Sequence, residues 1–214
     1  MTARLSRRNV LGGLASLAVA GISPAAARSP RFDLEHFVSD VRAANKESNA
    51  QRAVEEVLAR ALAHPASVLE GLGEPTTVGL SPIFRAHDLT ILNIVWPPWM
   101  MLPPHNHLMW ATIGIYTGRE DNIIWKRQAG GIVEAAGASS LSEGEVFSLP
   151  HDAIHSVTNP IPRLTAAVHI YGGDFFAAQR SEWDPDSLEE HPQDFEAVQQ
   201  LFRDTNRRFQ ATQE

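Results

Sequence analysis

The 214-residue sequence predicts a mainly β fold, a barrel or a sandwich, with helices before and after it. Between residues 76 and 180, short apolar runs alternate with Gly, Pro and Asn, which is typical of short strands joined by turns. On both sides of this region, apolar residues recur at helical spacing. Because the length suits one well-buried domain and hardly two, we expect a single core organised as α, then β, then α.

The N-terminal flank, residues 28–75, carries two helical stripes. The first follows Asp33, a residue suited to an N-cap, and has apolar side chains at positions i, i+3, i+4 and i+7: Leu34, Phe37, Val38 and Val41. The second extends from Val54 to Leu62 and ends before Pro65. We expect this pair of helices to pack on the wall of the β region.

The β region, residues 76–180, is expected to contain six strands with turn residues between them. They are Leu89–Trp96, Trp110–Tyr116, Asn122–Lys126, Glu145–Leu149, His155–Thr158 and Leu164–Tyr171. In the C-terminal extension, residues 181–214, the helical pattern returns after Pro192, with Phe195, Val198 and Phe202 on one face.

The first 27 residues have the features of an export signal. Three arginines precede an apolar stretch, Val10 to Ile22, that is short for a membrane span, and Ala25-Ala26-Ala27 offers a cleavage site. The segment Ser6-Arg7-Arg8-Asn9-Val10-Leu11 resembles a twin-arginine signal. This resemblance implies the twin-arginine translocation machinery as a partner, a periplasmic or secreted protein, and no stable membrane span after cleavage. An ordinary secretory signal is the alternative.

Composition narrows the chemistry. The chain has no cysteine, so thiolate ligands, disulfides and a cysteine nucleophile are excluded. Its formal net charge is −7, which argues against nucleic acid as a partner. Nine histidines are more than packing requires in a chain of this size.

Two segments carry candidate metal ligands. His105 and His107 are two residues apart in an expected extended segment, so their side chains should point to the same face. His155 starts a later strand, after the turn residues Pro150 and Asp152. Taken alone, the first pair fits two surface histidines about as well as two ligands.

Together the segments resemble the two cupin motifs. The second motif, G-x5-P-x-G-x2-H-x3-N, is matched by Gly144, Pro150, His155 and Asn159, with Asp152 in place of the inner glycine. The first, G-x5-H-x-H-x3-4-E-x6-G, is matched by His105, His107 and Gly118. The resemblance implies a double-stranded β-helix in which His105, His107 and His155 bind one metal ion.

The positions that depart from the first motif indicate which group of cupins the sequence resembles. Trp99 stands at the leading glycine, and Ala111 or Thr112 stands at the glutamate. Cupins with three neutral histidines and no carboxylate ligand are similar to the thiol dioxygenases, including cysteine dioxygenase. That resemblance covers residues 83–176 and implies Fe(2+), with about three open positions for a small thiol and O2.

Three further residues gain a role from this resemblance. Arg85 is similar to an arginine that binds the substrate carboxylate, and a solvated turn residue is the alternative. Ala167-Val168-His169-Ile170-Tyr171 resembles a Ser-x-His-x-Tyr element, so His169 and Tyr171 are candidate catalytic residues. Ala167 replaces the serine of that element, and Thr112 stands where some members have a cysteine. Core packing alone is the alternative for His169 and Tyr171.

The expected function is therefore the oxidation of a small thiol, of the cysteine or 3-mercapto acid type, to a sulfinate with O2. Two alternatives stay open. One is a metal-dependent cupin that isomerises a ligand without O2 chemistry, and the other is a pure binding protein in which the metal anchors the ligand.

Overall fold

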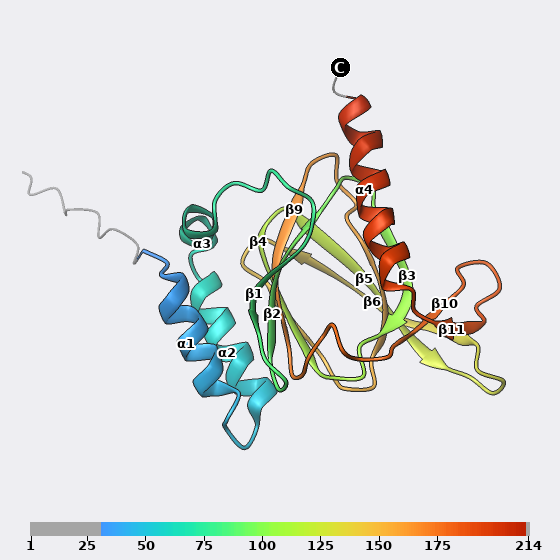
Figure 1. Cartoon of the computed structure of the whole chain (residues 1–214), viewed down its shortest axis with the longest axis horizontal. Helices are drawn as coiled ribbons and strands as arrows, with labels where there is room; N and C mark the ends of the chain where they lie inside the picture. The colour runs from blue at the N-terminus through green and yellow to red at the C-terminus, as the bar shows by residue number, and fades with distance from the viewer. Residues whose placement is uncertain (1–30, 213–214) are drawn as a thin grey trace, which may run out of the picture.

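The computed structural model describes residues 31–212, so the expected signal peptide, residues 1–27, lies outside the described residues. Two antiparallel sheets face each other across one interior, with helices on the outside (Figure 1). The five-stranded sheet contains, in spatial order, β1 (Gly79–Arg85), β2 (Thr90–Trp96), β9 (Thr165–Tyr171), β4 (Ala111–Thr117) and β7 (Val146–Leu149). The six-stranded sheet contains, in the same way, β11 (Glu190–Pro192), β10 (Ser181–Trp183), β3 (Met101–Asn106), β8 (Ile154–Thr158), β5 (Arg119–Arg127) and β6 (Val133–Ser142).

All six expected strands are present, as β2, β4, β5, β7, β8 and β9. The largest difference at a strand start is in β5, which begins at Arg119 rather than Asn122. The sequence did not predict β1, β3 and β6, because Pro-rich or Gly- and Ser-rich segments give weak strand signals. Two short strands, β10 and β11, lie in the segment that was expected to be a helical extension.

The five-stranded sheet is buried on both faces. On β2, Leu92, Ile94 and Trp96 point into the space between the sheets, whereas Ile91 and Val95 pack outward against the helices. The alternation follows from the pleat, which turns successive side chains to opposite faces. β9 follows the same rule, with Ala167 and Tyr171 inside. A side chain at an odd position of β9 therefore faces the barrel interior.

Three helices cover the outer face of this sheet: α1 (Leu34–Ala44), α2 (Ala50–Leu62) and α3 (Pro65–Leu72). The first begins after Asp33, whose carboxylate accepts a hydrogen bond from the His36 amide, as the sequence predicts. The third was not predicted, since Pro65 was interpreted as a stop. Proline is also favoured at the first position of a helix, and here it starts α3.

Close contact between α2 and β4 depends on Gly114. A Cβ atom there would lie 2.3 Å from Leu62 Cδ1 and 2.8 Å from Leu58 Cδ2. The missing side chain lets the helix approach the strand, and the two leucines fill the space.

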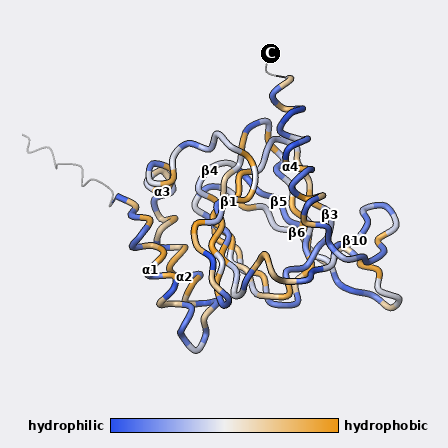
Figure 2. Tube along the Cα trace, in the orientation of Figure 1, coloured by the Kyte–Doolittle hydropathy of each residue, from blue (hydrophilic) through white to orange (hydrophobic). Residues whose placement is uncertain are grey.

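On the opposite side of the molecule lies α4 (Phe195–Ala211). Figure 2 shows it as a largely hydrophilic helix, and only Val198 and Phe202 are buried. Both belong to the core between the sheets rather than to the outer core under α1–α3. The helix thus closes one end of the barrel. Across residues 31–212, none of the helices has the length and apolar character required to cross a bilayer.

Candidate metal centre

Three histidines converge inside the barrel. His105 lies on β3, His107 follows that strand directly, and His155 lies on β8. The antiparallel pairing of β3 with β8 places His105 opposite His155. Each of the three offers a ring nitrogen within 4.8 Å of the others, and all three are buried. The sequence spacing and the strand register together produce this group.

Hydrogen bonds on the far side of the rings direct the Nε2 atoms inward. His105 Nδ1 is 2.9 Å from the carbonyl oxygen of Pro103, and His155 Nδ1 is 2.7 Å from Asn122 Oδ1. Both partners are acceptors, so both Nδ1 atoms carry the proton. The Nε2 atom of His105 and that of His155 then each have a free lone pair, as metal ligation requires.

The spacing of the nitrogens fits a metal ion. His155 Nε2 lies 3.3 Å from His107 Nε2. Two imidazole nitrogens bound to one ion at about 2.1 Å, at octahedral or tetrahedral angles, lie roughly 3.0–3.4 Å apart. The residues therefore fit a single metal ion held by three histidines.

Burial keeps these histidines neutral. It lowers the pKa of His105 to about 4, and the effect exceeds that of the hydrogen bond to Pro103, which acts in the opposite direction. Burial, with the neighbouring rings adding to it, also holds the pKa of His107 and of His155 well below the usual value. Neutral imidazole is the ligand form, so little proton competition opposes metal binding near neutral pH.

The histidines open into a small cavity of about 30 Å³. This volume holds roughly two water molecules, because one water molecule needs ~10–15 Å³. Apolar side chains form most of its wall, including Trp96, Phe175, Val198 and Phe202, and the polar groups that face it are His169, Tyr171, Gln193 and Arg180. A few polar groups in an apolar wall are typical of a small-molecule site.

Arg180 is the cation of this cavity. It is 7% exposed, and its guanidinium carbon lies over the Phe175 ring, 3.9 Å from the centroid. Burial lowers its pKa, although Arg stays protonated at any physiological pH. Among residues 31–212, its guanidinium has neither an ion pair nor a hydrogen bond. A buried charge without a partner is costly unless a ligand supplies one.

Arg85 is placed elsewhere. Its guanidinium makes a forked pair with Asp174, at 2.8 and 2.9 Å, and stacks over Phe176. The side chain is half exposed and does not line the cavity. The structure therefore does not bring Arg85 to the three histidines, and its guanidinium is already paired with the Asp174 carboxylate.

His169 and Tyr171 do face the site from β9. The Tyr171 hydroxyl lies 3.2 Å from His169 Nδ1, and the Tyr171 ring packs edge-on against His107 at 5.0 Å between centroids. Burial raises the pKa of Tyr171, so the phenol keeps its proton. The residue at the serine position, Ala167, is buried in the apolar core, and the Thr112 hydroxyl bonds to Ser148 outside the cavity lining.

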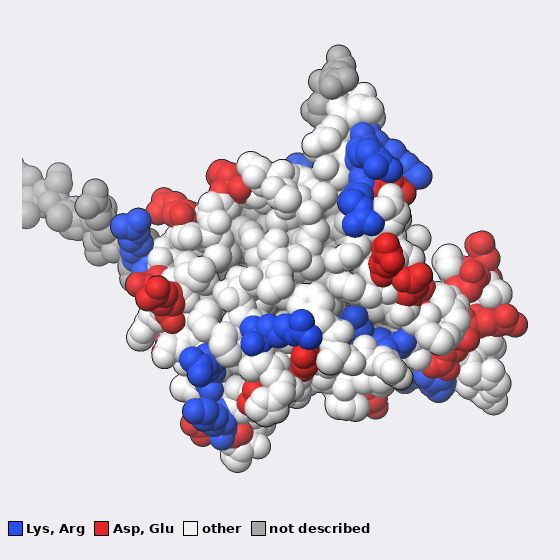
Figure 3. Space-filling model, in the orientation of Figure 1, with Lys and Arg blue, Asp and Glu red and all other residues white. Residues whose placement is uncertain are grey.

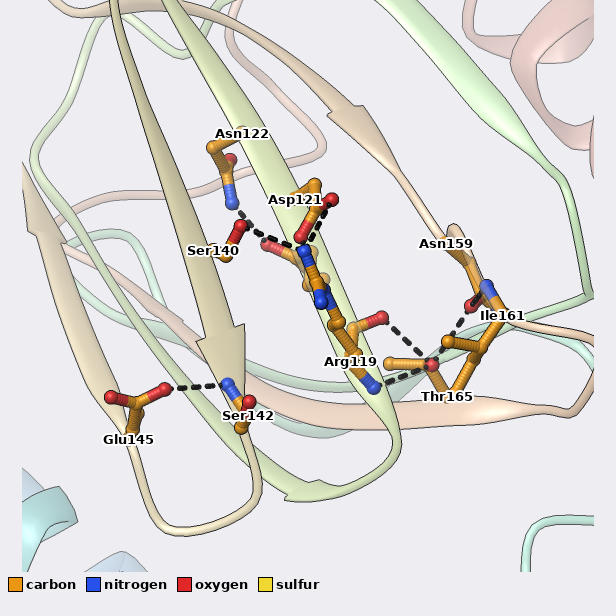
Figure 4. A network of polar contacts seen from close by, with 10 residues as sticks. Arg119, Asp121, Asn122, Ser140, Ser142, Glu145, Asn159, Ile161 and Thr165 are labelled. Carbon is orange, nitrogen blue, oxygen red and sulfur yellow. Dashed lines mark hydrogen bonds and ion pairs between the residues drawn. The ribbon is translucent and has the colours of Figure 1, made fainter.

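Behind these residues, β5 contributes two polar side chains that point inward. Glu120 and Asn122 are both buried and share one face of the strand. The Arg119 amide donates to the Thr165 hydroxyl at 3.0 Å, which ties the start of β5 to the start of β9 (Figure 4). On the outer side, Arg119 is bonded to Asp121 and Ser140. The bond between the Arg119 amide and Thr165 holds the backbone next to Glu120 in place.

Sequence reasoning missed Arg180 and Glu120. Arg180 lies in an irregular segment with no periodic signal. Glu120 is part of Arg-Glu-Asp, which has the composition of an exposed turn. A strand boundary at Arg119 instead of Asn122 would have placed Glu120 and Asn122 on one face, and that period-two relation is the signal that could have revealed it.

On the face shown in Figure 3, charged side chains of both signs are scattered, and basic ones gather on α4. The last turns of α4 supply three arginines to this exposed surface, namely Arg203, Arg207 and Arg208.

No family model matches the sequence. Among solved structures, the chain is similar to a cupin protein from Methanocaldococcus jannaschii described as having a double-stranded β-helix fold, with 14% identity and a TM-score of 0.40 over 48% of this chain and 86% of that one. It is also similar to an uncharacterised protein with a double-stranded β-helix domain from Klebsiella pneumoniae, with 16% identity and a TM-score of 0.39 over 53% and 87% of the two chains. An oxalate oxidase structure matches at 17% identity and a TM-score of 0.34, over 40% and 42%.

The path of the chain decides the fold class. From β2 to β5 and again from β6 to β10, each strand lies in the sheet opposite to the one before it. The fold is a double-stranded β-helix. In this β-helix the three histidines lie on, or directly after, two neighbouring strands of the six-stranded sheet, and His169 and Tyr171 face them from the five-stranded sheet.

Proposed function

We propose that this protein is a non-haem iron(II) dioxygenase that oxidises a small thiol carrying a carboxylate to a sulfinate with O2. One observation supports the proposal most directly. Three neutral histidines without a carboxylate ligand share a small, mostly apolar cavity with one buried arginine that has no ion pair among the described residues. A small anionic molecule with a second group that can bind the metal would satisfy both.

His105, His107 and His155 would hold the metal on one side, which leaves room for a substrate and O2. Iron(II) would supply the activation of O2 and the binding of sulfur. The neutral ligand set favours an anionic thiolate, and the chain has no cysteine that could compete for the metal. Zinc, manganese or nickel would fit the same nitrogens, so the choice of iron rests on the resemblance to thiol dioxygenases.

Arg180 would bind the substrate carboxylate, the role that the resemblance gives to Arg85. Its planar guanidinium presents paired donors to a carboxylate, and stacking on Phe175 holds that plane in place. Binding would also pair a largely buried charge that has no ion pair among the described residues. We therefore assign substrate recognition to Arg180 rather than to Arg85, which forms a forked ion pair with Asp174.

Tyr171 would place a phenol beside the metal ligands, where it can exchange a hydrogen bond with the bound substrate or oxygen. His169 supports that phenol from the same strand. The apolar wall of the cavity excludes bulk water, which strengthens each of these polar contacts.

The test is elemental analysis of protein purified without oxygen, followed by O2 uptake with a panel of small thiols. We expect about one iron per chain, lost in His155→Ala, and O2 consumption that depends on a thiol and yields a sulfinate. His191→Ala is the matched control, because His191 is half exposed and outside the cavity.

Two other outcomes would contradict this proposal. One bound metal without O2 uptake by any thiol would contradict the dioxygenase and favour a cupin that isomerises or retains a ligand. No bound metal under any loading condition would contradict the site itself.

We also propose that the protein is exported by the twin-arginine machinery. N-terminal sequencing of the protein recovered from the periplasm should begin after Ala27. Replacing Arg7 and Arg8 with lysine should leave the full-length chain in the cytoplasm.

A further inference from the structure

Glu120 and His169 meet inside the barrel although they belong to different sheets. Glu120 is 0% exposed on β5, and His169 is 2% exposed on β9. Glu120 Oε2 lies 3.5 Å from His169 Nε2. This contact is a close approach of the two groups and not a hydrogen bond, and neither atom has a hydrogen-bond partner in the described chain. Within residues 31–212, Glu120 is also the only fully buried carboxylate. Its open oxygen faces the imidazole.

Asn122 fixes which oxygen of Glu120 stays open. The Asn122 carbonyl oxygen accepts from His155 Nδ1, as the metal site requires, so only its NH2 group can face Glu120. That NH2 donates to Glu120 Oε1 at 3.1 Å (Figure 4). Oε1 is thereby occupied, and Oε2 is left for His169.

We propose that Glu120 is a positioning residue that keeps the proton of His169 on Nε2 and so fixes the direction of the hydrogen bond between His169 and Tyr171. A carboxylate can only accept, so the nitrogen that faces it must carry the proton. Nδ1 is then an acceptor, and the Tyr171 hydroxyl donates to it. The lone pairs of the phenol oxygen are left for a donor in the cavity.

Glu120 takes the place of a side-chain partner that His169 lacks on its own strand. Ala167, at the serine position of the Ser-x-His-x-Tyr pattern, has no side-chain oxygen that could bond to His169. The carboxylate reaches His169 from the opposite sheet instead. The order carboxylate, imidazole, hydroxyl is the logic of a catalytic triad, in which the acid sets the tautomer of the histidine. The tautomer of His169 does not depend on which reaction the protein catalyses. The effect of that tautomer on turnover rests on the proposed function.

The test is Glu120→Gln, which keeps the shape of the side chain. The amide oxygen must stay toward the Asn122 NH2 group, so the amide NH2 faces His169 Nε2 and turns that nitrogen into an acceptor. The proton then moves to Nδ1. ¹⁵N-histidine NMR of the zinc-loaded full chain separates the two tautomers, because protonated and bare ring nitrogens resonate far apart. We expect Nε2–H in the wild type and Nδ1–H in Glu120→Gln. The same tautomer in both proteins would overturn the proposal.

Two further variants distinguish the effect of Glu120 on the tautomer from the effects of neighbouring residues. Asp121→Asn makes the same acid-to-amide change on the same strand, at a side chain bonded to Arg119, and should keep Nε2–H. Tyr171→Phe removes the other partner of His169 and should also keep Nε2–H. A shift to Nδ1–H in Tyr171→Phe would assign the tautomer to Tyr171 and overturn the proposal, even if Glu120→Gln did not fold.

Steady-state kinetics test whether the tautomer of His169 affects turnover. With the thiol that the wild type consumes, Glu120→Gln should lower kcat ~10- to 100-fold with KM within about twofold, and Asp121→Asn should leave both unchanged. An inverted tautomer with unchanged kcat would overturn the catalytic consequence. If no thiol is consumed even by the wild type while the tautomer inverts, the dioxygenase proposal fails and the positioning role of Glu120 stands.

Discussion

The guanidinium carbon of Arg180 lies 3.9 Å from the centroid of the Phe175 ring, and the Phe175 ring in turn packs 4.4 Å from that of Tyr171. Stacking holds the arginine against the wall that also carries the phenol, so its position is set before a substrate arrives. Such preorganisation lowers the entropic cost of binding an anion.

Replacing Arg180 should raise KM for a carboxylated thiol but not for an uncharged one. We expect Arg180→Met to raise KM for a carboxylated thiol roughly 10- to 100-fold, because a hydrogen bond to a charged group contributes about 1.5–3 kcal/mol. KM for an uncharged thiol should change little. Steady-state O2 uptake with both thiols measures the difference.

Arg85→Met is the control for this prediction, because Arg85 pairs with Asp174 outside the cavity. A large increase in KM for the carboxylated thiol in Arg85→Met, with none in Arg180→Met, would return the role to Arg85.

Asn122 should determine how tightly the metal is held. Its carbonyl oxygen accepts from His155 Nδ1 at 2.7 Å and fixes the ring that presents Nε2. Removing such a partner typically lowers metal affinity roughly 10- to 100-fold, and we expect this from Asn122→Ala in a competition titration with a chelator. Asn93→Ala removes a comparable contact, the acceptor for the Tyr116 hydroxyl, and should leave metal affinity unchanged.

The metal-free protein should lose stability on mild acidification. Because burial lowers the pKa of His105 to about 4, the native state stays neutral while the unfolded chain takes up protons as pH falls through 6.5. The contribution is complete above pH 6.5 and is lost on the way down to pH 4. His105 alone should lower the free energy of unfolding by about 2 kcal/mol between pH 7.5 and pH 5.

Urea unfolding at the two pH values measures this loss. His105→Asn should lose less stability over the same interval than the wild type does. A free energy of unfolding that is independent of pH in the metal-free wild type would show that the histidines are accessible to protons in the native state.

Phe202 should hold α4 on the open end of the barrel. Its ring is 2% exposed and lies 5.1 Å from the Trp96 ring. Phe202→Ala should lower the free energy of unfolding by about 3 kcal/mol, and the enlarged cavity should admit bulkier thiols. Arg203→Ala, on the exposed side of the same helix, should change stability by less than about 0.5 kcal/mol. An equal loss in both variants would mean that α4 does not close the cavity through Phe202.

Local patterns were enough to predict the elements that depend on local chemistry. Asp33 caps α1, and the apolar run Leu89–Trp96 contains the strand β2, both as predicted. The convergence of His105, His107 and His155 also followed from spacing and motif. Arg180 could not be found in this way, because it lies in an irregular segment and reaches the cavity only in the folded chain. Glu120 required the correct start of β5 at Arg119, and its partner His169 lies on a strand that is distant in sequence. The same holds for Arg85, where a matching motif gave no information about the competing partner Asp174.

The register between β3 and β8 has a consequence for folding kinetics. Residues His107 and His155 are 48 positions apart in the sequence, and the chain between them contributes strands to both sheets. Contacts between such distant segments form late, because the entropy of closing the intervening loop must be overcome first. A metal ion held by all three histidines would therefore bind after the rate-limiting step. It would act mainly by slowing the opening of the finished barrel, so that the lifetime of the native state, rather than its rate of formation, would reflect metal supply.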